Sequence, residues 1–155
     1  MTYLALYDSI LDLPVPVIAD HVGGALGRSK LPPEFQESPL SQPGFSSLTS
    51  LARQGRVIVK ISGLYRCSSD AVSTYGDMKP IIESLAREVP DQLVWGSDWP
   101  HTGDGAARLK NTDIDVKEGF RSIDNLGILR SLRDWMGSEQ AWEKLMSDNP
   151  ARFYK

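Results

Sequence analysis

Residues that could carry out chemistry follow three short apolar runs of the sequence. His21 comes after the first run, Arg66 after the second and Asp98 after the third. A carboxylate such as Asp98 can act as a general base toward water. An imidazole such as His21 can bind a metal, polarise a carbonyl group or carry a proton. An arginine such as Arg66 can bind a substrate carboxylate with two parallel hydrogen bonds.

Each of these residues also has a purely structural interpretation. His21 could be a hydrogen-bonded histidine at a strand end, and Asp98 could cap the turn that follows it. Arg66 could form a surface salt bridge. Cys67 has no paired base near it in the sequence, so we expect a buried, inert thiol. His101 follows Trp99 and Pro100, and we expect it to support the site rather than to react.

The three apolar runs predict the strands that must position these residues. The runs cover Val15–Ala19, Val57–Ile61 and Leu93–Trp95, and Lys60 is their one charged interruption. The first two are rich in β-branched residues and do not alternate with polar ones. Such runs are typical of parallel strands that are covered on both faces.

Helical spacing of apolar residues occurs between and after the runs. The first dozen residues predict a helix ending near Pro14, and Asp77 is the expected N-cap of a central helix. Gly137 ends another predicted helix, and Ser138 begins the last one. The remaining predicted helix covers Phe45–Gln54, with Gly55 as its stop. Residues 24–44 and 104–119 are predicted to be long loops.

Alternating helices and strands predict an α/β layer with right-handed crossovers. The carboxyl ends of parallel strands lie at one edge of such a layer, where α/β proteins place their sites. We therefore expect His21, Arg66 and Asp98 to converge. Residues 23–30 are rich in glycine but lack both the P-loop and the dinucleotide-binding pattern, so we expect no nucleotide site there.

Four motifs in matching order resemble those of the amidohydrolase-related TIM-barrel hydrolases, in the branch of 2-pyrone-4,6-dicarboxylate lactonase. The resemblance implies the C-terminal part of a (β/α)8 barrel, with about three parallel strands and flanking helices. It also implies that residues 1–155 are one domain truncated at its N-terminus, because the family chain is about twice as long and carries a first-strand His-x-His that is absent here. The motifs are Asp20–Gly23, Val59–Arg66, Val94–His101 and Asn149–Tyr154.

The resemblance assigns roles to individual residues. Asp98 would activate water, His21 would hold or polarise a lactone carbonyl, and Arg66 would bind a substrate carboxylate. Tyr65, Ser62 and His101 complete the predicted substrate-binding set. The lactonase branch implies hydrolysis of a small carboxylated lactone without a cofactor. If zinc or manganese is present instead, as in related decarboxylases, His21 and Asp98 would hold it.

Composition limits the classes of partner. The 155 residues carry a formal net charge of −3 and a single cysteine. We therefore expect no nucleic acid and no membrane partner, and a cytoplasmic location. Three strands cannot close a barrel, so we expect the chain to self-associate or to pair with a missing N-terminal half. An inactive fragment, an assembly partner and a metal-dependent decarboxylase are the alternatives to a lactonase.

Overall fold

Three parallel strands form the centre of the fold. The computed structural model describes residues 3–72, 74–103, 117 and 119–154. In this part of the chain the strands lie in the order β1-β2-β3, with Val17 paired to Val57 and Val59 paired to Leu93. The predicted α/β class with three parallel strands is confirmed. The strands are β1 (Val17–Ala19), β2 (Val57–Ile61) and β3 (Leu93–Trp95).

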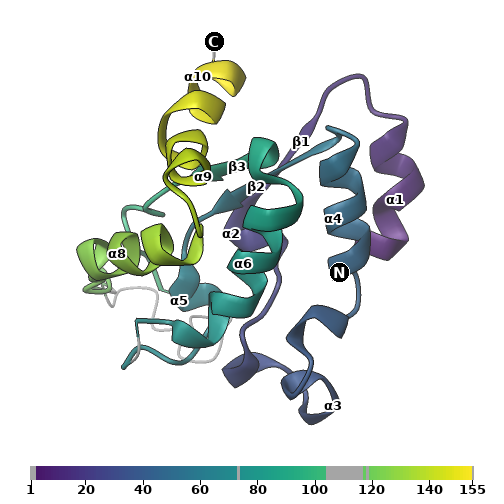
Figure 1. The fold of residues 1–155 in the computed structure, drawn as a ribbon. Helices are drawn as coiled ribbons and strands as arrows, with labels where there is room; N and C mark the ends of the chain where they lie inside the picture. Colours follow the sequence, from purple (N-terminus) through teal and green to yellow (C-terminus); the bar gives the residue numbers. More distant parts are fainter. Residues whose placement is uncertain (1–2, 73, 104–116, 118, 155) are drawn as a thin grey trace.

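The longer helices pack on one another and on one face of this sheet (Figure 1). α4 contacts β2, α1 packs on α4, and α6 lies between α4 and α8. A π-helical segment, Lys144–Asp148, joins α9 to α10 and packs on β3. The helices are α1 (Tyr3–Leu11), α4 (Phe45–Arg53), α6 (Lys79–Glu88), α8 (Asn125–Trp135), α9 (Glu139–Glu143) and α10 (Asn149–Phe153).

Short helical turns occupy the connections. Residues 24–44, predicted to be a long loop, contain three such turns, while most of the second predicted loop, 104–119, lies outside the described residues. The one-turn α-helices are α2 (Asp20–Gly23), α3 (Pro33–Gln36) and α5 (Leu64–Cys67), and the 3-10 turns are Arg28–Lys30, Pro39–Ser41, Gly76–Met78 and Pro90–Gln92.

The core lies between the sheet and the helices. Val57, Val59 and Ile61 alternate along β2 and point into one cluster with the apolar faces of the helices. This alternation leaves Ile58 and Lys60 on the opposite face of the sheet. The largest fully buried side chains are Leu48, Leu51, Ile61, Leu64, Met78, Ile81, Ile82, Leu85, Leu93, Leu132, Leu145 and Val22.

The first strand differs from the prediction in two ways. It begins at Val17 rather than Val15, because Pro14 and Pro16 have no N–H to donate to a ladder. The prediction that it is covered on both faces was wrong, since Ile18 is 44% exposed. β1 is an outer strand with β2 as its one described neighbour in the sheet.

Most of the predicted helix ends are confirmed. Ser138 caps α9 by accepting a hydrogen bond from the Ala141 N–H, and Gly137 and Gly55 adopt left-handed conformations after α8 and α4. The prediction that Asp77 caps a helix was wrong. The chain enters α6 through a 3-10 turn, so the Asp77 carboxylate instead accepts hydrogen bonds from Ser29 and Ser68.

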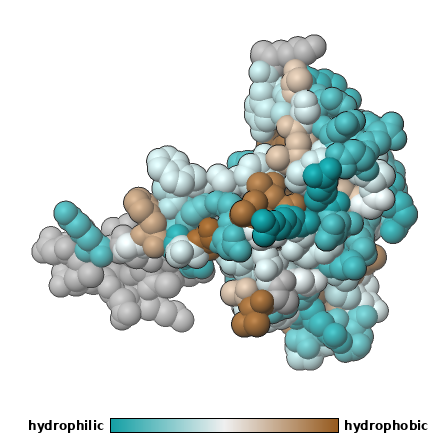
Figure 2. Space-filling model, turned by 60° about the vertical axis from the view of Figure 1, so that its left-hand side comes forward, coloured by the Kyte–Doolittle hydropathy of each residue, from teal (hydrophilic) through white to brown (hydrophobic). Residues whose placement is uncertain are grey.

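Hydrophobic residues reach the surface in several separate areas among hydrophilic ones on the face shown in Figure 2. Trp99, in the segment after β3, is the most exposed of the described tryptophans. The large hydrophobic side chains that are exposed among the described residues are Leu13, Val15, Ile18, Leu40, Val72, Trp99, Phe120, Leu126 and Tyr154.

Candidate active site

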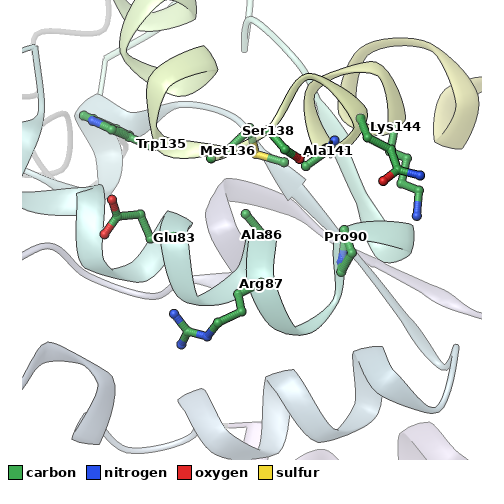
Figure 3. A pocket seen from close by; sticks show the side chains of 11 residues that line it. Glu83, Ala86, Arg87, Pro90, Trp135, Met136, Ser138, Ala141 and Lys144 are labelled. Atoms are coloured by element: carbon green, nitrogen blue, oxygen red, sulfur yellow. Dashed lines mark hydrogen bonds between the residues drawn. The ribbon is translucent and has the colours of Figure 1, made fainter.

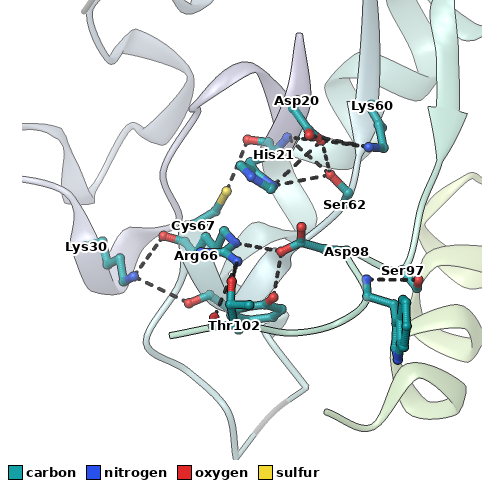
Figure 4. A network of polar contacts seen from close by, with 12 residues as sticks. Asp20, His21, Lys30, Lys60, Ser62, Arg66, Cys67, Ser97, Asp98 and Thr102 are labelled. Carbon is teal, nitrogen blue, oxygen red and sulfur yellow. Dashed lines mark hydrogen bonds and ion pairs between the residues drawn. The ribbon is translucent and has the colours of Figure 1, made fainter. Parts of the chain in front are cut away.

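The three predicted strand ends meet at one edge of the sheet (Figure 4). His21 follows β1, Arg66 lies on α5 directly after β2, and Asp98 lies three residues after β3. Because the strands are parallel, these ends emerge on the same side. The structure therefore brings the three predicted residues together.

Asp98 is the centre of the polar contacts. Its Oδ2 atom accepts a hydrogen bond of 2.6 Å from the Tyr65 hydroxyl and another of 2.6 Å from Nε of Arg66. Partial burial raises the pKa of Asp98, but these hydrogen bonds and the nearby charges of His21 and Arg66 outweigh it. The pKa of Asp98 is therefore below its ordinary value. Asp98 is ionised at neutral pH and can accept a proton.

Arg66 is paired within the protein. Besides the bond to Asp98, its Nη2 atom lies 3.4 Å from the carbonyl oxygen and 3.3 Å from Oγ1 of Thr102. The hydrogen bond to Asp98 raises the pKa of Arg66. Its Nη1 atom makes no hydrogen bond within the described residues. Sequence reasoning anticipated a guanidinium directed at substrate, whereas the structure directs its Nε to the catalytic candidate Asp98.

Tyr65 is held in its protonated form. Burial, followed by the hydrogen bond to Asp98, raises the pKa of Tyr65 to about 12. The guanidinium carbon of Arg66 lies 5.1 Å from the centre of the Tyr65 ring. The Tyr65 hydroxyl therefore stays a hydrogen-bond donor at neutral pH. The Arg66 guanidinium, which donates to the same Asp98 oxygen, lies against the Tyr65 ring.

His21 faces Asp98 across Gly63. A Cβ atom added to Gly63 would lie 2.7 Å from Oδ2 of Asp98 and 2.8 Å from Nδ1 of His21. Both side chains thus occupy the space that a larger residue would fill. Nδ1 of His21 is also 3.4 Å from Oγ of Ser62. Imidazole and carboxylate therefore border one small space above the end of β2.

Ser62 is buried and connects His21 to a second carboxylate. The Ser62 hydroxyl donates a 2.5 Å hydrogen bond to Oδ1 of Asp20. The same oxygen accepts a 3.0 Å hydrogen bond from the backbone N–H of His21. Lys60 Nζ lies 3.3 Å from the same carboxylate. The structure thus makes Ser62 a support for His21, while the predicted contact of Ser62 with substrate stays a prediction.

Sequence reasoning missed Asp20 and Lys60 as members of this network. Burial raises the pKa of Asp20, but the hydrogen bond from Ser62, with smaller effects of His21 and Lys60, lowers it overall. The Lys60 side chain lies against Gly96, because a Cβ atom added to Gly96 would lie 2.7 Å from Cε of Lys60. The sequence contains one signal for Lys60, which is the single charged residue of the apolar run Val57–Ile61.

The His101 ring packs against Tyr65, and the His101 backbone N–H donates a 3.0 Å hydrogen bond to the carbonyl oxygen of Asp98. Its ring is buried and meets the Tyr65 ring edge-on at 5.9 Å, and its Nε2 is 3.1 Å from Nδ2 of Asn125. The His101 ring therefore packs against Tyr65, while its predicted supporting and substrate-binding roles stay predictions.

Cys67 is buried, as predicted. Burial raises the pKa of its thiol to about 12, and the thiol faces the His21 carbonyl oxygen at 3.2 Å. A thiol of such high pKa is a poor nucleophile at neutral pH. Cys67 therefore packs against the His21 backbone and has a structural role.

The donor set does not fit a zinc or manganese ion by itself. No group of three His, Cys, Asp or Glu side chains that could hold a metal occurs in the described part of the chain. Of the two residues expected to hold one, Asp98 already shares its Oδ2 with Arg66 and Tyr65. Zinc sites need three or four protein ligands, and the described residues supply no such set.

A separate hollow of about 340 Å³ lies between α6 and the α8–α9 region (Figure 3). Glu83 and Arg87 line one side, and Trp135 and Lys144 line the other. It contains none of the predicted site residues. The strand ends, and not this hollow, form the candidate active site.

The whole sequence, residues 1–155, matches the amidohydrolase family. The chain belongs to the amidohydrolase family. This membership confirms the resemblance inferred from the four motifs. Within the described residues, this amidohydrolase has no helix long and apolar enough to cross a membrane.

Curated relatives of this amidohydrolase include enzymes named for lactones. The chain is 32% identical over 152 residues to 4-sulfomuconolactone hydrolase of Rhizobium radiobacter, covering 96% of the chain and 42% of that protein. It is 26% identical over 156 residues to 2-pyrone-4,6-dicarboxylate hydrolase of Comamonas testosteroni, covering 96% and 44%. The chain thus spans less than half the length of these relatives.

Solved structures share the fold. A structure from Agrobacterium tumefaciens aligns with a TM-score of 0.70 at 20% identity, over 97% of this chain and 45% of that one. An Acinetobacter baumannii protein described as a probable 2-pyrone-4,6-dicarboxylic acid hydrolase, with citric acid bound, aligns at 0.66 and 17% identity, over 98% and 48%. Three parallel strands with flanking helices therefore correspond to part of a larger barrel fold.

Proposed function

We propose that this amidohydrolase takes part in hydrolysing a small lactone that bears carboxylate groups, with Asp98 activating water. The observation that carries the proposal is the ionised Asp98 carboxylate beside His21 at the strand ends, with Oδ2 held by Tyr65 and Arg66. The names of the lactone-hydrolysing relatives support this substrate class.

The reaction follows from the roles of two residues. Asp98 removes a proton from water, and the water oxygen forms a bond to the lactone carbonyl carbon. His21 donates a hydrogen bond to the negative oxygen that develops, which lowers the barrier. The ring C–O bond then breaks, and Asp98 returns the proton to the leaving oxygen. One water is consumed and one carboxylic acid is formed, without a covalent enzyme intermediate.

Arg66 has two parts in this scheme. Its Nε atom holds Oδ2 of Asp98, which keeps the carboxylate ionised and oriented. Its Nη2 atom lies near Thr102, and the edge formed by Nη1 and Nη2 is the part of the group that can meet a substrate carboxylate. The resemblance assigned only the second part to Arg66.

Turnover of 2-pyrone-4,6-dicarboxylate tests the proposal. We expect Asp98→Asn to lower kcat at least about 100-fold, the lower end for losing a general base, while substrate affinity changes little. Pyrone absorbance measures turnover, with and without a chelator, and calorimetry measures binding. Hydrolysis that is unaffected by Asp98→Asn would refute the mechanism, and hydrolysis lost with the chelator would favour the metal-dependent alternative.

A binding or assembly role without catalysis is the second candidate. The chain spans 42% to 44% of the lactone-hydrolysing relatives' length, and β1 leaves Ile18 exposed at an outer edge. A chain that binds the pyrone dicarboxylate but does not hydrolyse it would favour this candidate.

A further inference from the structure

Arg121 is a second arginine beside the Tyr65 ring, and it has no part in the reaction proposed for Asp98 and His21. Its guanidinium carbon lies 5.3 Å from the centre of the Tyr65 ring. The guanidinium carbon of Arg66 lies 5.1 Å from the centre of the same ring. Two cationic groups therefore lie against the phenol whose hydroxyl holds Asp98.

The backbone fixes the position of Arg121. Its N–H donates a 2.9 Å hydrogen bond to the carbonyl oxygen of His101. His101 is itself buried, and its ring contacts Asn125 and Tyr65. The side chain of Arg121 is exposed while its backbone is tied to the turn that follows β3. The guanidinium is thus presented to solvent from an anchored residue at the edge of the site.

The two arginines differ in their acidic partners. Arg66 forms an ion pair with Asp98, whereas no carboxylate among the described residues pairs with Arg121. The Tyr65 ring covers one side of the Arg121 guanidinium and leaves the N–H groups at its edge available to a ligand. That edge fits a carboxylate or sulfonate through two parallel hydrogen bonds.

We propose that Arg121 binds a second acidic group of the substrate and thereby selects dianionic lactones over monoanionic ones. This inference rests on the proposed function and specifies its substrate class. Arg66 can serve only one acidic group, since its Nε is bound to Asp98. A ligand with two acidic groups therefore needs another cation at the site, and Arg121 supplies it.

The test measures the affinity of the 155-residue chain for 2-pyrone-4,6-dicarboxylate, for its two monoacids and for citrate by calorimetry. We expect Arg121→Gln to weaken binding of the diacid about tenfold, the effect of losing a charged hydrogen-bond pair. The monoacid that keeps the acidic group bound by Arg121 should lose affinity similarly for the Arg121→Gln variant. The other monoacid should bind this variant as tightly as it binds the unchanged chain. Arg121→Lys should restore part of the loss.

Arg130→Gln on α8 is the matched control, because Arg130 is exposed and has no described partner at the site. Circular dichroism checks that each variant is folded. Equal diacid affinity in the Arg121→Gln variant and the unchanged chain would overturn the proposal, even if the lactone is hydrolysed.

Citrate separates the two proposals. Citrate binding that depends on Arg121, without binding of the pyrone diacid, would refute the lactone substrate but support the role of Arg121. Binding of neither citrate nor the diacid would refute both.

Discussion

At the scale of single residues, the two oxygens of Asp98 have different surroundings. Oδ2 accepts hydrogen bonds from Tyr65 and Arg66, whereas no described group donates to Oδ1. Oδ1 is therefore the atom that can take a proton from water. The hydrogen bonds on Oδ2 fix the direction in which Oδ1 points, so precise positioning offsets the weaker basicity that a lowered pKa brings.

Tyr65→Phe should raise the pKa of Asp98 toward its ordinary value of 3.8, because a donor to the ionised form is lost. Activity that needs ionised Asp98 falls as the pH drops through this pKa, so the acidic limb of the profile should move to higher pH. A pH profile of kcat/KM measures the shift. Tyr154→Phe, at an exposed position, is the control and should leave the profile unchanged.

The same change should affect stability in a pH-dependent way. Asp98 has a lowered pKa in the folded state, so it stabilises the fold above pH 3.8 and loses this effect as the pH falls through the folded value. We expect Tyr65→Phe to lower the free energy of unfolding by about 1–2 kcal/mol at neutral pH and by less in acid. A difference that grows toward low pH would contradict this assignment.

At the scale of elements, each strand is followed within three residues by a residue with a left-handed backbone. The φ angles are 50° at His21, 53° at Gly63 and 60° at Asp98. Such angles cost roughly 1–2 kcal/mol for a residue with a side chain. Strained residues of this kind concentrate at functional sites, and here each one turns the chain where a strand meets the site. The strand ends are thus shaped to aim His21 and Asp98 at each other.

Gly63→Ala should disturb this arrangement most directly. The added methyl group would meet Asp98 and His21 at less than 3 Å, in addition to the cost of the left-handed backbone. We expect a loss of about 3 kcal/mol or more in the free energy of unfolding, measured by urea denaturation.

Gly55→Ala is the matched control for this prediction. Gly55 has a φ of 70°, but a Cβ atom there would have nothing within 4 Å. Only the backbone cost of about 1–2 kcal/mol should remain. Equal losses for the two variants would show that the crowding at Gly63 has no energetic effect.

At the scale of the whole molecule, the described sheet has two outer strands, β1 and β3, and the matched relatives are longer than this chain. β1 is one outer strand, and its Ile18 side chain is 44% exposed on the face opposite the helices. The solved relatives are about twice as long as this chain, which covers 45% and 48% of two of them. Open strand edges with apolar side chains favour association with further chain, either from a partner or from a second copy.

Ile18→Lys should reduce self-association of the chain. A charge on an outer strand opposes edge-to-edge pairing, and Ile18 contributes little to the core because its side chain is partly exposed. Sedimentation at increasing protein concentration measures the association, and a thermal melt checks that the fold is retained. A chain that sediments as a monomer at every concentration before the substitution would refute the prediction of self-association.

The sequence alone was sufficient to predict the order of elements and the convergence of His21, Arg66 and Asp98, while the catalytic roles of these residues stay predictions. Apolar runs and helical spacing are local patterns, and they located the three strands and the longer helices to within a few residues. The parallel order then placed His21, Arg66 and Asp98 at one edge, because strand direction determines where strand ends lie. Even Ser138 and Gly137 were recognisable as helix boundaries, since capping depends on neighbouring residues.

Tertiary structure decided which partner each polar group takes. Arg66 binds Asp98, Asp77 binds Ser29, and Arg121 lies against the Tyr65 ring, although the members of each pair are more than 30 positions apart in the chain. A hydrogen bond depends on distances of a few tenths of an ångström, which local sequence patterns do not encode. The sequence could name the chemical groups, but only the folded chain could determine which of them remain available to a substrate.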